Sequence, residues 1–312
     1  MPSLPPLLSG FAPIWVLTAV GYLVGRSGLL GPQADMVLNR FVFHVAMPAA
    51  LFVMIARTPL DRFANASMLA FAAGTAVATG LGLLAAHRLF DRALPERAIG
   101  GMAAGYVNSA NLGIPVAMQV LGDASFVAPV VLFQILLVTP AVLTVLDSGR
   151  AGRRALLTLP LRNPVLLAVA VGAAASAVTT STGWHLPDEV ERSCQLLGGA
   201  GVPTALVALG MSLHHRPAAA GTARLAEVGV AVAVKTLIQP LAAFAVGAFL
   251  LHLPPHQLLT VVLFSALPTA QNVFTYAREY GRGTALARDS VLWSTLVSMA
   301  TLSAVSWALG PA

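Results

Sequence analysis

Ten apolar runs, each long enough to cross a lipid bilayer, follow one another along this chain with little sequence between them. A bilayer core of about 30 Å needs roughly 20 helical residues. Hydrophobic residues make up 57% of the 312 residues and charged residues only 10%, too few to give a soluble protein its surface. We therefore expect one membrane domain, 1–312, with no soluble domain appended. The runs are Leu7–Gly25, Val37–Ala56, Ser67–Phe90, Ala98–Leu121, Phe126–Leu146, Pro164–Thr180, Cys194–Leu213, Ala226–Leu251, Gln257–Ala277 and Ala285–Leu309.

The basic residues alternate between successive connections. Odd-numbered connections hold 14 of the 18, even-numbered connections and both tails hold Arg57, Arg62 and Arg192, and Lys235 lies inside a run. This bias predicts cytoplasmic odd connections, both termini on the non-cytoplasmic side, and a multi-pass protein of the inner (plasma) membrane. It also explains the net charge of +6 without nucleic acid as a partner. The odd-side residues are Arg26, Arg40, Arg88, Arg92, Arg97, Arg150, Arg153, Arg154, Arg162, Arg216, Arg224, Arg278, Arg282 and Arg288.

The two halves of the chain resemble each other. In the first, Gly28-Leu29-Leu30 and Asp35 precede a run that contains Pro48; in the second, Gly183 and Asp188 precede a run that contains Pro203. Residues 1–147 and 163–312 each hold five runs, and an odd number of spans inverts the second copy. The prediction is an all-α integral membrane fold of ten transmembrane helices in two inverted five-helix repeats, a common plan of secondary transporters.

The fourth and ninth runs, which correspond in the two halves, both carry proline together with amide side chains. Proline lacks an N–H group and its ring clashes with the preceding turn, so it interrupts a helix. Interrupted helices in lipid need protein, water or a ligand to satisfy their backbone, and paired interruptions indicate a transport site whose half-helix N-termini can receive an anion. Gly113 is expected to add backbone freedom. The candidate site residues are Asn108, Asn111, Gly113, Pro115, Pro268, Thr269, Gln271 and Asn272, with Pro48 and Pro203 as further possibilities.

These residues also carry a family resemblance. Residues 108–115 read NSANLGIP, followed by Gly122-Asp123, and residues 268–274 read PTAQNVF, followed by Tyr280-Gly281. Both stretches resemble the fourth- and ninth-helix signatures of the auxin efflux carrier family, which includes bacterial transporters and the plant PIN-FORMED proteins. Arg162-Asn163-Pro164, the run from Pro203 to Leu213, and Lys235 with Pro240 also fit. The long cytoplasmic loop of many plant members is missing.

The resemblance implies a scaffold part and a transport part, with the fourth and ninth helices crossing at their breaks and the substrate beside that crossing. It implies a secondary transporter of small organic anions, auxin-like or carboxylate substrates, working by alternating access and in the efflux direction. A homodimer in the lipid bilayer is also implied. Because the bile acid–sodium symporters have a related fold, sodium-coupled symport is an alternative, and a non-transporting membrane sensor with the same fold is another.

Two titratable residues inside the apolar runs have open roles. Lys235 is expected near mid-membrane, where a charge faces a cavity or a partner. It is a counter-charge for the substrate, a cation in place of bound sodium, or a partner of backbone carbonyls. His44 is expected well inside the second run, as a packed ring or as a proton-linked group. No carboxylate lies clearly at mid-span, so sodium or proton coupling stays open.

An enzyme is the least expected class. The sequence has no H-E-x-x-H or G-x-S-x-G motif and no paired intramembrane carboxylates. Its one cysteine, Cys194, excludes an internal disulfide framework and a multi-cysteine metal site. We expect no cofactor and no metal centre.

Overall fold

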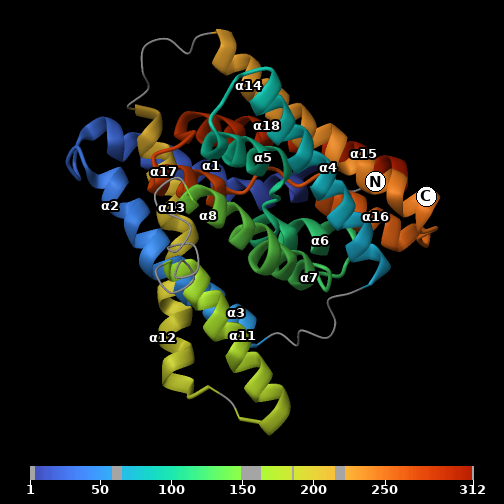
Figure 1. Ribbon diagram of the computed structural model, residues 1–312, viewed down its shortest axis with the longest axis horizontal. Helices are drawn as coiled ribbons and strands as arrows, with labels where there is room; N and C mark the ends of the chain where they lie inside the picture. The colour runs from blue at the N-terminus through green and yellow to red at the C-terminus, as the bar shows by residue number, and fades with distance from the viewer. Residues whose placement is uncertain (1–3, 58–64, 149–162, 185, 215–221, 311–312) are drawn as a thin grey trace.

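The protein is all-helical in the residues that the computed structural model describes, 4–57, 65–148, 163–184, 186–214 and 222–310 (Figure 1). Seven helical stretches are long and apolar enough to cross a membrane, which identifies an integral membrane protein. The three other predicted spans are the first helix, α1 (Leu4–Ser27), and the two interrupted helices, whose halves are 7 to 12 residues long. The count of ten spans and their inverted repeat remain predictions.

The first half of the chain forms eight α-helices and three π-helical turns in the described residues. They are α1, α2 (Ala34–Phe41) with η1 (Val42–Ala46) and α3 (Met47–Ala56), α4 (Ala66–Arg88), α5 (Leu94–Gly105), η3 (Ser109–Gly113) with α6 (Ile114–Val120), and α7 (Val127–Phe133) with η4 (Gln134–Val138) and α8 (Thr139–Ser148). The second half forms α11 (Pro164–Thr182), α12 (Asp188–Gly199), α13 (Gly201–His214), α14 (Thr222–Ala233), η5 (Val234–Ile238), α15 (Gln239–Ala245), η6 (Val246–Leu250), α16 (Pro255–Ser265), α17 (Gln271–Tyr280) and α18 (Thr284–Leu309).

Proline explains four of the five π-helical turns in the described residues. Each of η1, η3, η4 and η5 ends two residues before a proline, Pro48, Pro115, Pro140 and Pro240 respectively. The proline ring clashes with the carbonyl one turn earlier, and the missing N–H leaves that carbonyl without its usual donor. A wider i→i+5 turn relieves the clash while the helix continues.

The helices form two groups. In one, α3 packs against α11 and α12, and α13 packs against α1 and α2. In the other, α4, α5, α14, α15, α16 and α18 pack together with α7 and α8. The first group holds the long helices α11 and α12 that extend to the lower left in Figure 1. Between the groups, α17 of the second contacts α2, η1 and α13 of the first.

Charged side chains at the odd connections meet one another at one end of the molecule. The guanidinium of Arg92 binds Glu227 at 2.7 Å, which raises the pKa of Arg92, and Arg224 binds Asp289 at the same distance. Arg278 binds Asp35 at 2.5 Å. Six of the basic residues counted in the sequence lie outside the described residues: Arg62, Arg150, Arg153, Arg154, Arg162 and Arg216.

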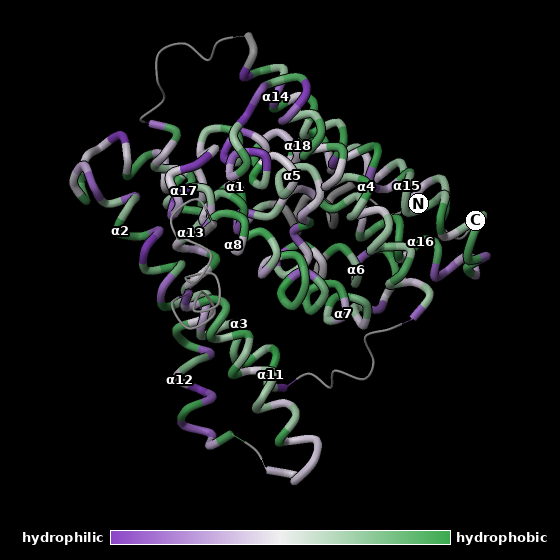
Figure 2. The backbone as a smooth tube through the Cα atoms, in the orientation of Figure 1, coloured by the Kyte–Doolittle hydropathy of each residue, from purple (hydrophilic) through white to green (hydrophobic). Residues whose placement is uncertain are grey.

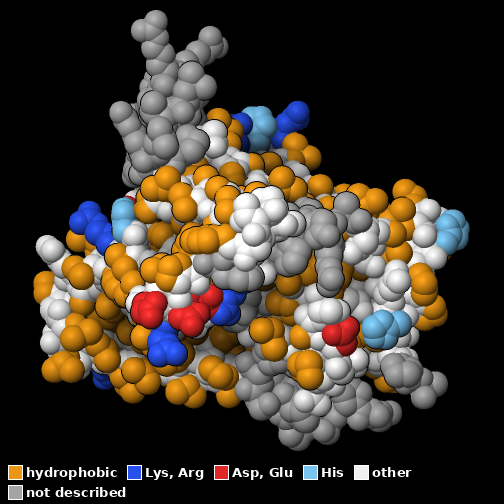
Figure 3. Space-filling model, turned by 90° about the horizontal axis from the view of Figure 1, so that it is seen from below, with side chains coloured by type: hydrophobic (Ala, Val, Ile, Leu, Met, Phe, Trp, Pro, Cys, Tyr) orange, Lys and Arg blue, Asp and Glu red, His pale blue; other side chains and the backbone are white. Residues whose placement is uncertain are grey.

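Even connections meet at the opposite end, seen in Figure 3 as a largely apolar face with charged side chains gathered in small groups. Arg57, after α3, pairs with Glu191 near the start of α12. Asp123 lies with His256 along a surface hollow between the start of α4 and the start of α16. Two hydrogen bonds from Ser125 lower the pKa of Asp123. Figure 2, coloured by the hydropathy of each residue, shows mostly hydrophobic residues between these two ends.

Candidate functional site

The two interrupted helices cross where both are unwound, and their backbones pair there. The Asn108 N–H donates to the Pro268 carbonyl at 2.8 Å, and the Ala270 N–H donates to the Tyr106 carbonyl at 3.1 Å. The pairing is an antiparallel bridge between Val107 and Thr269. The two unwound segments, 106–108 and 266–270, thus satisfy part of each other's backbone inside the membrane protein.

Side chains from other segments donate to further carbonyls of the fourth-helix break. Thr269 donates its hydroxyl to the Ala103 carbonyl at 2.7 Å, and Gln239 donates its amide to the Gly105 carbonyl at 3.1 Å. The Val107 carbonyl accepts from Gln134 Nε2 at 2.9 Å. All three donors are buried. These donors make the break more compatible with a membrane interior.

Lys235 donates to the end of the other broken helix. It is fully buried, and its Nζ donates to the carbonyl of Ser265, the last residue of α16, at 3.0 Å. It does not line the cavity described below. Of the three roles considered for Lys235, this hydrogen bond fits that of a partner for a backbone carbonyl at the crossing. Because Lys235 does not line the cavity, it would not contact a ligand bound there.

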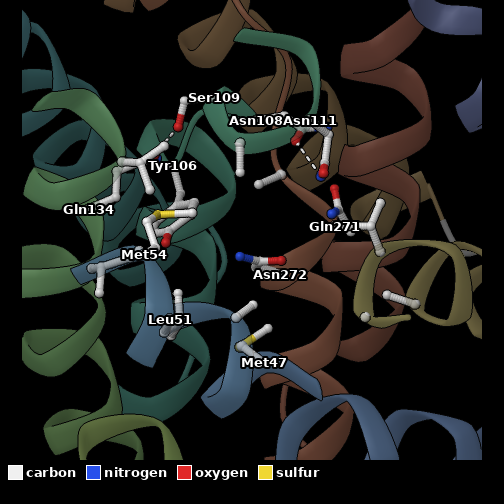
Figure 4. Close-up of a pocket in the computed structure, with 18 of the residues that line it drawn as sticks. Met47, Leu51, Met54, Tyr106, Asn108, Ser109, Asn111, Gln134, Gln271 and Asn272 are labelled. Carbon is white, nitrogen blue, oxygen red and sulfur yellow. Dashed lines mark hydrogen bonds between the residues drawn. The ribbon is translucent and has the colours of Figure 1, made fainter. Parts of the chain in front are cut away.

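A cavity of about 210 Å³ lies beside the crossing (Figure 4). Its polar lining comes from the fourth-helix break, η3, η4 and the start of α17, and its apolar lining comes mainly from η1, α3, α7, η4 and α13. Among the described residues that line it, none is Asp, Glu, Lys, Arg or His. The lining includes Val42, Met47, Leu51, Met54, Tyr106, Asn108, Ser109, Asn111, Val131, Gln134, Ile135, Val202, Ala205, Gln271 and Asn272.

Amide groups at the cavity are only partly used by the protein. Asn111 Nδ2 donates to Asn108 Oδ1 at 3.0 Å, and Ser109 donates to Gln134 Oε1 at 2.6 Å. Gln271 is 2% exposed, and its Oε1 has no hydrogen-bond partner. In Figure 4 the Gln271 side chain lies next to Asn111, and the Asn272 amide points into the cavity. A buried, unpaired amide is costly unless something else binds it.

Two helix N-termini also face this cavity. The helix α17 begins at Gln271 and η3 begins at Ser109, both of which line it. Among the described residues, no acceptor is recorded for the backbone N–H groups of Gln271 and Asn272. Unpaired N–H groups and the positive end of the helix dipole favour an anion.

Gly113 and Pro115 differ from expectation. Gly113 has φ −57° and ψ −49°, ordinary helical values, so it adds no special backbone freedom. A Cβ there would lie 3.3 Å from Phe264 Cε1, so close packing is what requires glycine. Pro115 lies in the first turn of α6, where no N–H is needed, and the helix is unwound at 106–108 instead. Pro268, by contrast, lies inside the unwound segment.

His44 and the two paired prolines lie outside the cavity lining. His44 lies within the candidate span Ala34–Ala56, and its side chain is 48% exposed. Its Nδ1 lies 3.1 Å from the Arg40 carbonyl and its Nε2 lies 3.8 Å from Glu279. Pro48 follows η1, and Pro203 lies in the first turn of α13 just after the interruption at Ala200. Their neighbours Met47 and Val202 line the cavity instead.

Sequence reasoning missed three polar residues of the site. Gln134 and Gln239 are single glutamines in apolar runs, and Tyr106 precedes the amide cluster; its hydroxyl lies 3.0 Å from Thr139 Oγ1. The available signal was their polarity within long apolar segments, because such residues seldom face lipid. Ser109 lay within the recognised motif but was not singled out.

Known proteins similar to this chain are membrane transporters. The family model described as "Membrane transport protein" matches residues 7–155 and 150–306. A protein of Rhizobium meliloti (strain 1021) named "Putative malonate transporter" is 28% identical over 304 residues, covering 93% of this chain and 92% of its own. The "Uncharacterized transporter YfdV" of Escherichia coli (strain K12) is 27% identical, covering 90% and 91%.

A plant relative matches a shorter stretch. The "Probable auxin efflux carrier component 5b" of Oryza sativa subsp. japonica is 32% identical over 145 residues, covering 45% of this chain and 38% of its own. The family model spans both halves of the chain, and the relatives are membrane transporters rather than enzymes. The two stretches that resemble the signatures of the auxin efflux carriers lie at the helix crossing. The chain therefore belongs to the membrane transport protein family, the group that includes the auxin efflux carriers.

Proposed function

We propose that this protein is a secondary transporter that moves a small organic anion, in the efflux direction, by alternating access at the helix crossing. One observation carries the proposal: a cavity of about 210 Å³ that is lined by the N-terminus of α17 and by the amide side chains of Asn111, Gln271 and Asn272. Hydrogen-bond donors converging in a water-poor cavity favour a carboxylate.

The lining favours one carboxylate attached to an apolar body. A second carboxylate would need a second set of donors or a cationic side chain, and the described lining contains no charged side chain. Opposite the amides, Met47, Leu51 and Met54 offer an apolar surface. A dicarboxylate is the second candidate substrate, favoured by the similarity along 93% of this chain to the relative named "Putative malonate transporter".

Ten transmembrane helices in two inverted repeats, 1–147 and 163–312, are part of this proposal. The pairing of one broken helix from each half supports it, as does the meeting of odd connections at one end and even connections at the other. We propose cytoplasmic odd connections and non-cytoplasmic termini in the plasma membrane. Impermeant thiol labelling in a Cys194→Ser background tests this: Arg282→Cys should react only from the cytoplasm and Asp123→Cys only from outside.

Alternating access would move one helix group against the other. The cavity lies between them, with α3 and α13 on one side and the crossing on the other. Movement of the crossing relative to α3 and α13 would expose the cavity first to one side of the membrane and then to the other. A homodimer in the bilayer is expected from the family resemblance, and the mass of the complex in a defined detergent tests it.

Thermal unfolding of the purified protein tests the binding part of the proposal. Phenylacetate should raise the unfolding midpoint, whereas phenylacetamide, which has the same shape but no charge, should not. Malonate provides the dicarboxylate comparison. A larger shift with malonate would replace the monocarboxylate class with the second candidate. Equal shifts with the acid and the amide would remove the anion site altogether.

Transport itself requires proteoliposomes. Radiolabelled acid identified by the binding screen should enter vesicles that contain the protein and not protein-free vesicles. Gln271→Ala should lower that rate without changing protein incorporation. Binding without any uptake would favour the non-transporting sensor over the transporter.

A further inference from the structure

A groove of about 400 Å³ lies on the lipid-facing side of the molecule, between the two helix groups. Its walls are α1 and the end of α13, from the first group, and α18, from the second. Along α1 the groove extends from Tyr22 to Trp15, and along α18 it extends from Asp289 to Leu296. At a rise of 1.5 Å per residue, the groove is about 10 Å long. It begins at the end of the molecule where the odd connections meet.

Close packing of α1 on α13 leaves this space on the side of α1 that faces α18. A Cβ at Gly210 of α13 would overlap the Thr18 carbonyl, and a Cβ at Gly25 would lie 3.0 Å from Met211 Cα. Glycine therefore brings these two helices together. Across the groove, α18 presents large apolar side chains, with Trp293 52% and Leu296 46% exposed. Both lie in a candidate membrane span, where the surrounding medium is lipid acyl chains.

Charged side chains meet at one end of the groove. Asp289, which lines the groove, is bound by Arg224 at 2.7 Å and by Arg288 at 2.8 Å. The carboxylate of α14, Glu227, is already bound by Arg92. The cluster therefore has two guanidinium groups for one carboxylate, and Arg224 Nε and Arg288 Nη2 have no acceptor in the described part of the chain. One positive charge is left to attract an anion.

We infer that this groove binds one anionic phospholipid, with an acyl chain between Trp15 and Trp293 and the phosphate near the Arg224–Asp289 pair. An apolar groove with an excess positive charge at one end matches a lipid whose acyl chain carries a negative head group. Tyr22 lies at the same end as Asp289 and has a polar tip, which suits the boundary between head groups and chains. A lipid in this position contacts both helix groups. The inference goes beyond the proposed function and does not depend on which solute is transported.

Tryptophan fluorescence gives the first test, because two of the four tryptophans line the groove. Trp184→Phe combined with Trp307→Phe leaves Trp15 and Trp293 as reporters. In bilayers of mixed composition, brominated phosphatidylglycerol should quench these reporters with a relative affinity about fivefold above that of brominated phosphatidylcholine, the effect of one cationic side chain on an anionic lipid. Equal quenching by the two lipids would overturn the inference.

The complementary variant is the control. Trp15→Phe combined with Trp293→Phe leaves Trp184 and Trp307, neither of which lines the groove, so the two lipids should quench it equally. The same preference for phosphatidylglycerol in both variants would mean that anionic lipid gathers around the whole protein, and the site would be wrong. In the reporter variant, Arg224→Gln should abolish the preference, whereas Arg224→Lys should keep it. A preference that survives Arg224→Gln would contradict the placement of the phosphate.

Filling the groove gives the second test. Ala19 lines the groove, whereas Val16 lies on the same helix outside it and is 59% exposed. Phosphatidylglycerol added to the protein in detergent should raise the unfolding midpoint of the wild type and of Val16→Phe, but not that of Ala19→Phe. A full rise in Ala19→Phe would overturn the inference. If Ala19→Phe does not fold, the quenching ratio decides.

The mass of the protein in detergent separates a lipid from a second copy of the chain. If Ala19→Phe alone halves that mass, a second copy covers the groove and the lipid inference is wrong. An unchanged mass together with a lost response to phosphatidylglycerol supports the lipid. None of these measurements uses an organic acid, so failure of the proposed function leaves their outcome unaffected.

Discussion

Arg278 forms an ion pair with Asp35 across the boundary between the two helix groups, with 2.5 Å between Nη2 and Oδ2. Arg278 lies in the last turn of α17 and Asp35 in the first turn of α2. Asn39 adds a hydrogen bond from its amide to the Thr275 carbonyl at 3.2 Å. Because α17 begins at the cavity and runs about 15 Å to Tyr280, these contacts join the groups at one end while the cavity lies at the other.

This pair should control how easily the two groups separate. Replacing Asp35 with Asn leaves the Arg278 guanidinium without its partner, so the unfolding midpoint should fall and thiol reagents should reach an added cysteine at position 43 faster. The exchange Asp35→Arg with Arg278→Asp should restore both, with a coupling of about 0.5–3 kcal/mol in a double-mutant cycle. Glu227→Gln breaks a pair within one group and should lower the midpoint without changing that accessibility.

Substitution of the Gln271 amide, which lines the cavity, should weaken binding. Gln271→Ala removes one donor to the bound carboxylate, a loss of about 1.5–3 kcal/mol or roughly 10- to 100-fold in Kd. Asn111→Ala should act in the same direction. Gln195→Ala, an exposed amide on α12, is the matched control and should bind with wild-type affinity. Isothermal titration calorimetry of each variant with the acid measures the Kd. An unchanged Kd in Gln271→Ala would show that this residue does not belong to the binding site.

Substitutions of Thr269 test how much its hydrogen bond at the crossing contributes to stability. Thr269→Val has nearly the same shape but leaves the Ala103 carbonyl buried without a donor, at a cost of about 1–3 kcal/mol. Thr269→Ser keeps the hydroxyl and should unfold closer to wild type. The difference between the two midpoints isolates the hydrogen bond from packing. Equal midpoints would mean that the bond contributes little to stability.

Gly105 tests the close approach of α5 to α4. A Cβ there would meet Thr79 of α4, with its backbone nitrogen at 3.1 Å and the Thr75 carbonyl at 3.2 Å. Gly105→Ala should therefore move α5, disturb the Gln239 hydrogen bond to its carbonyl, and reduce folded yield. Gly80→Ala on α4 has nothing within 4 Å of the added Cβ and should give wild-type yield. Size-exclusion profiles of the two variants make the comparison.

Proline, glycine and clustered amides in two apolar runs were enough to predict broken helices and their crossing residues. The exact point of unwinding was not predictable. A π-helical turn, η3, accommodates Pro115 without ending the helix, and the backbone is unwound before it, at 106–108. Gln134 and Gln239 were missed. In a membrane protein both lipid and core are apolar, so the sequence pattern gives little sign of which helix face is buried. Only tertiary packing brings Gln239 to Gly105, 134 positions away.

Hydrogen bonds at the crossing join residues from both halves of the chain, so neither half alone can satisfy the backbone of its broken helix. Without the second half, the carbonyls of Ala103 and Gly105 lose Thr269 and Gln239; without the first, the Ala270 N–H loses Tyr106. Each half expressed separately would enter the bilayer with unsatisfied backbone groups at its broken helix and would be a substrate for membrane quality control. The two halves must therefore fold together. A substitution in one of the paired segments then limits which substitutions the other segment can accept.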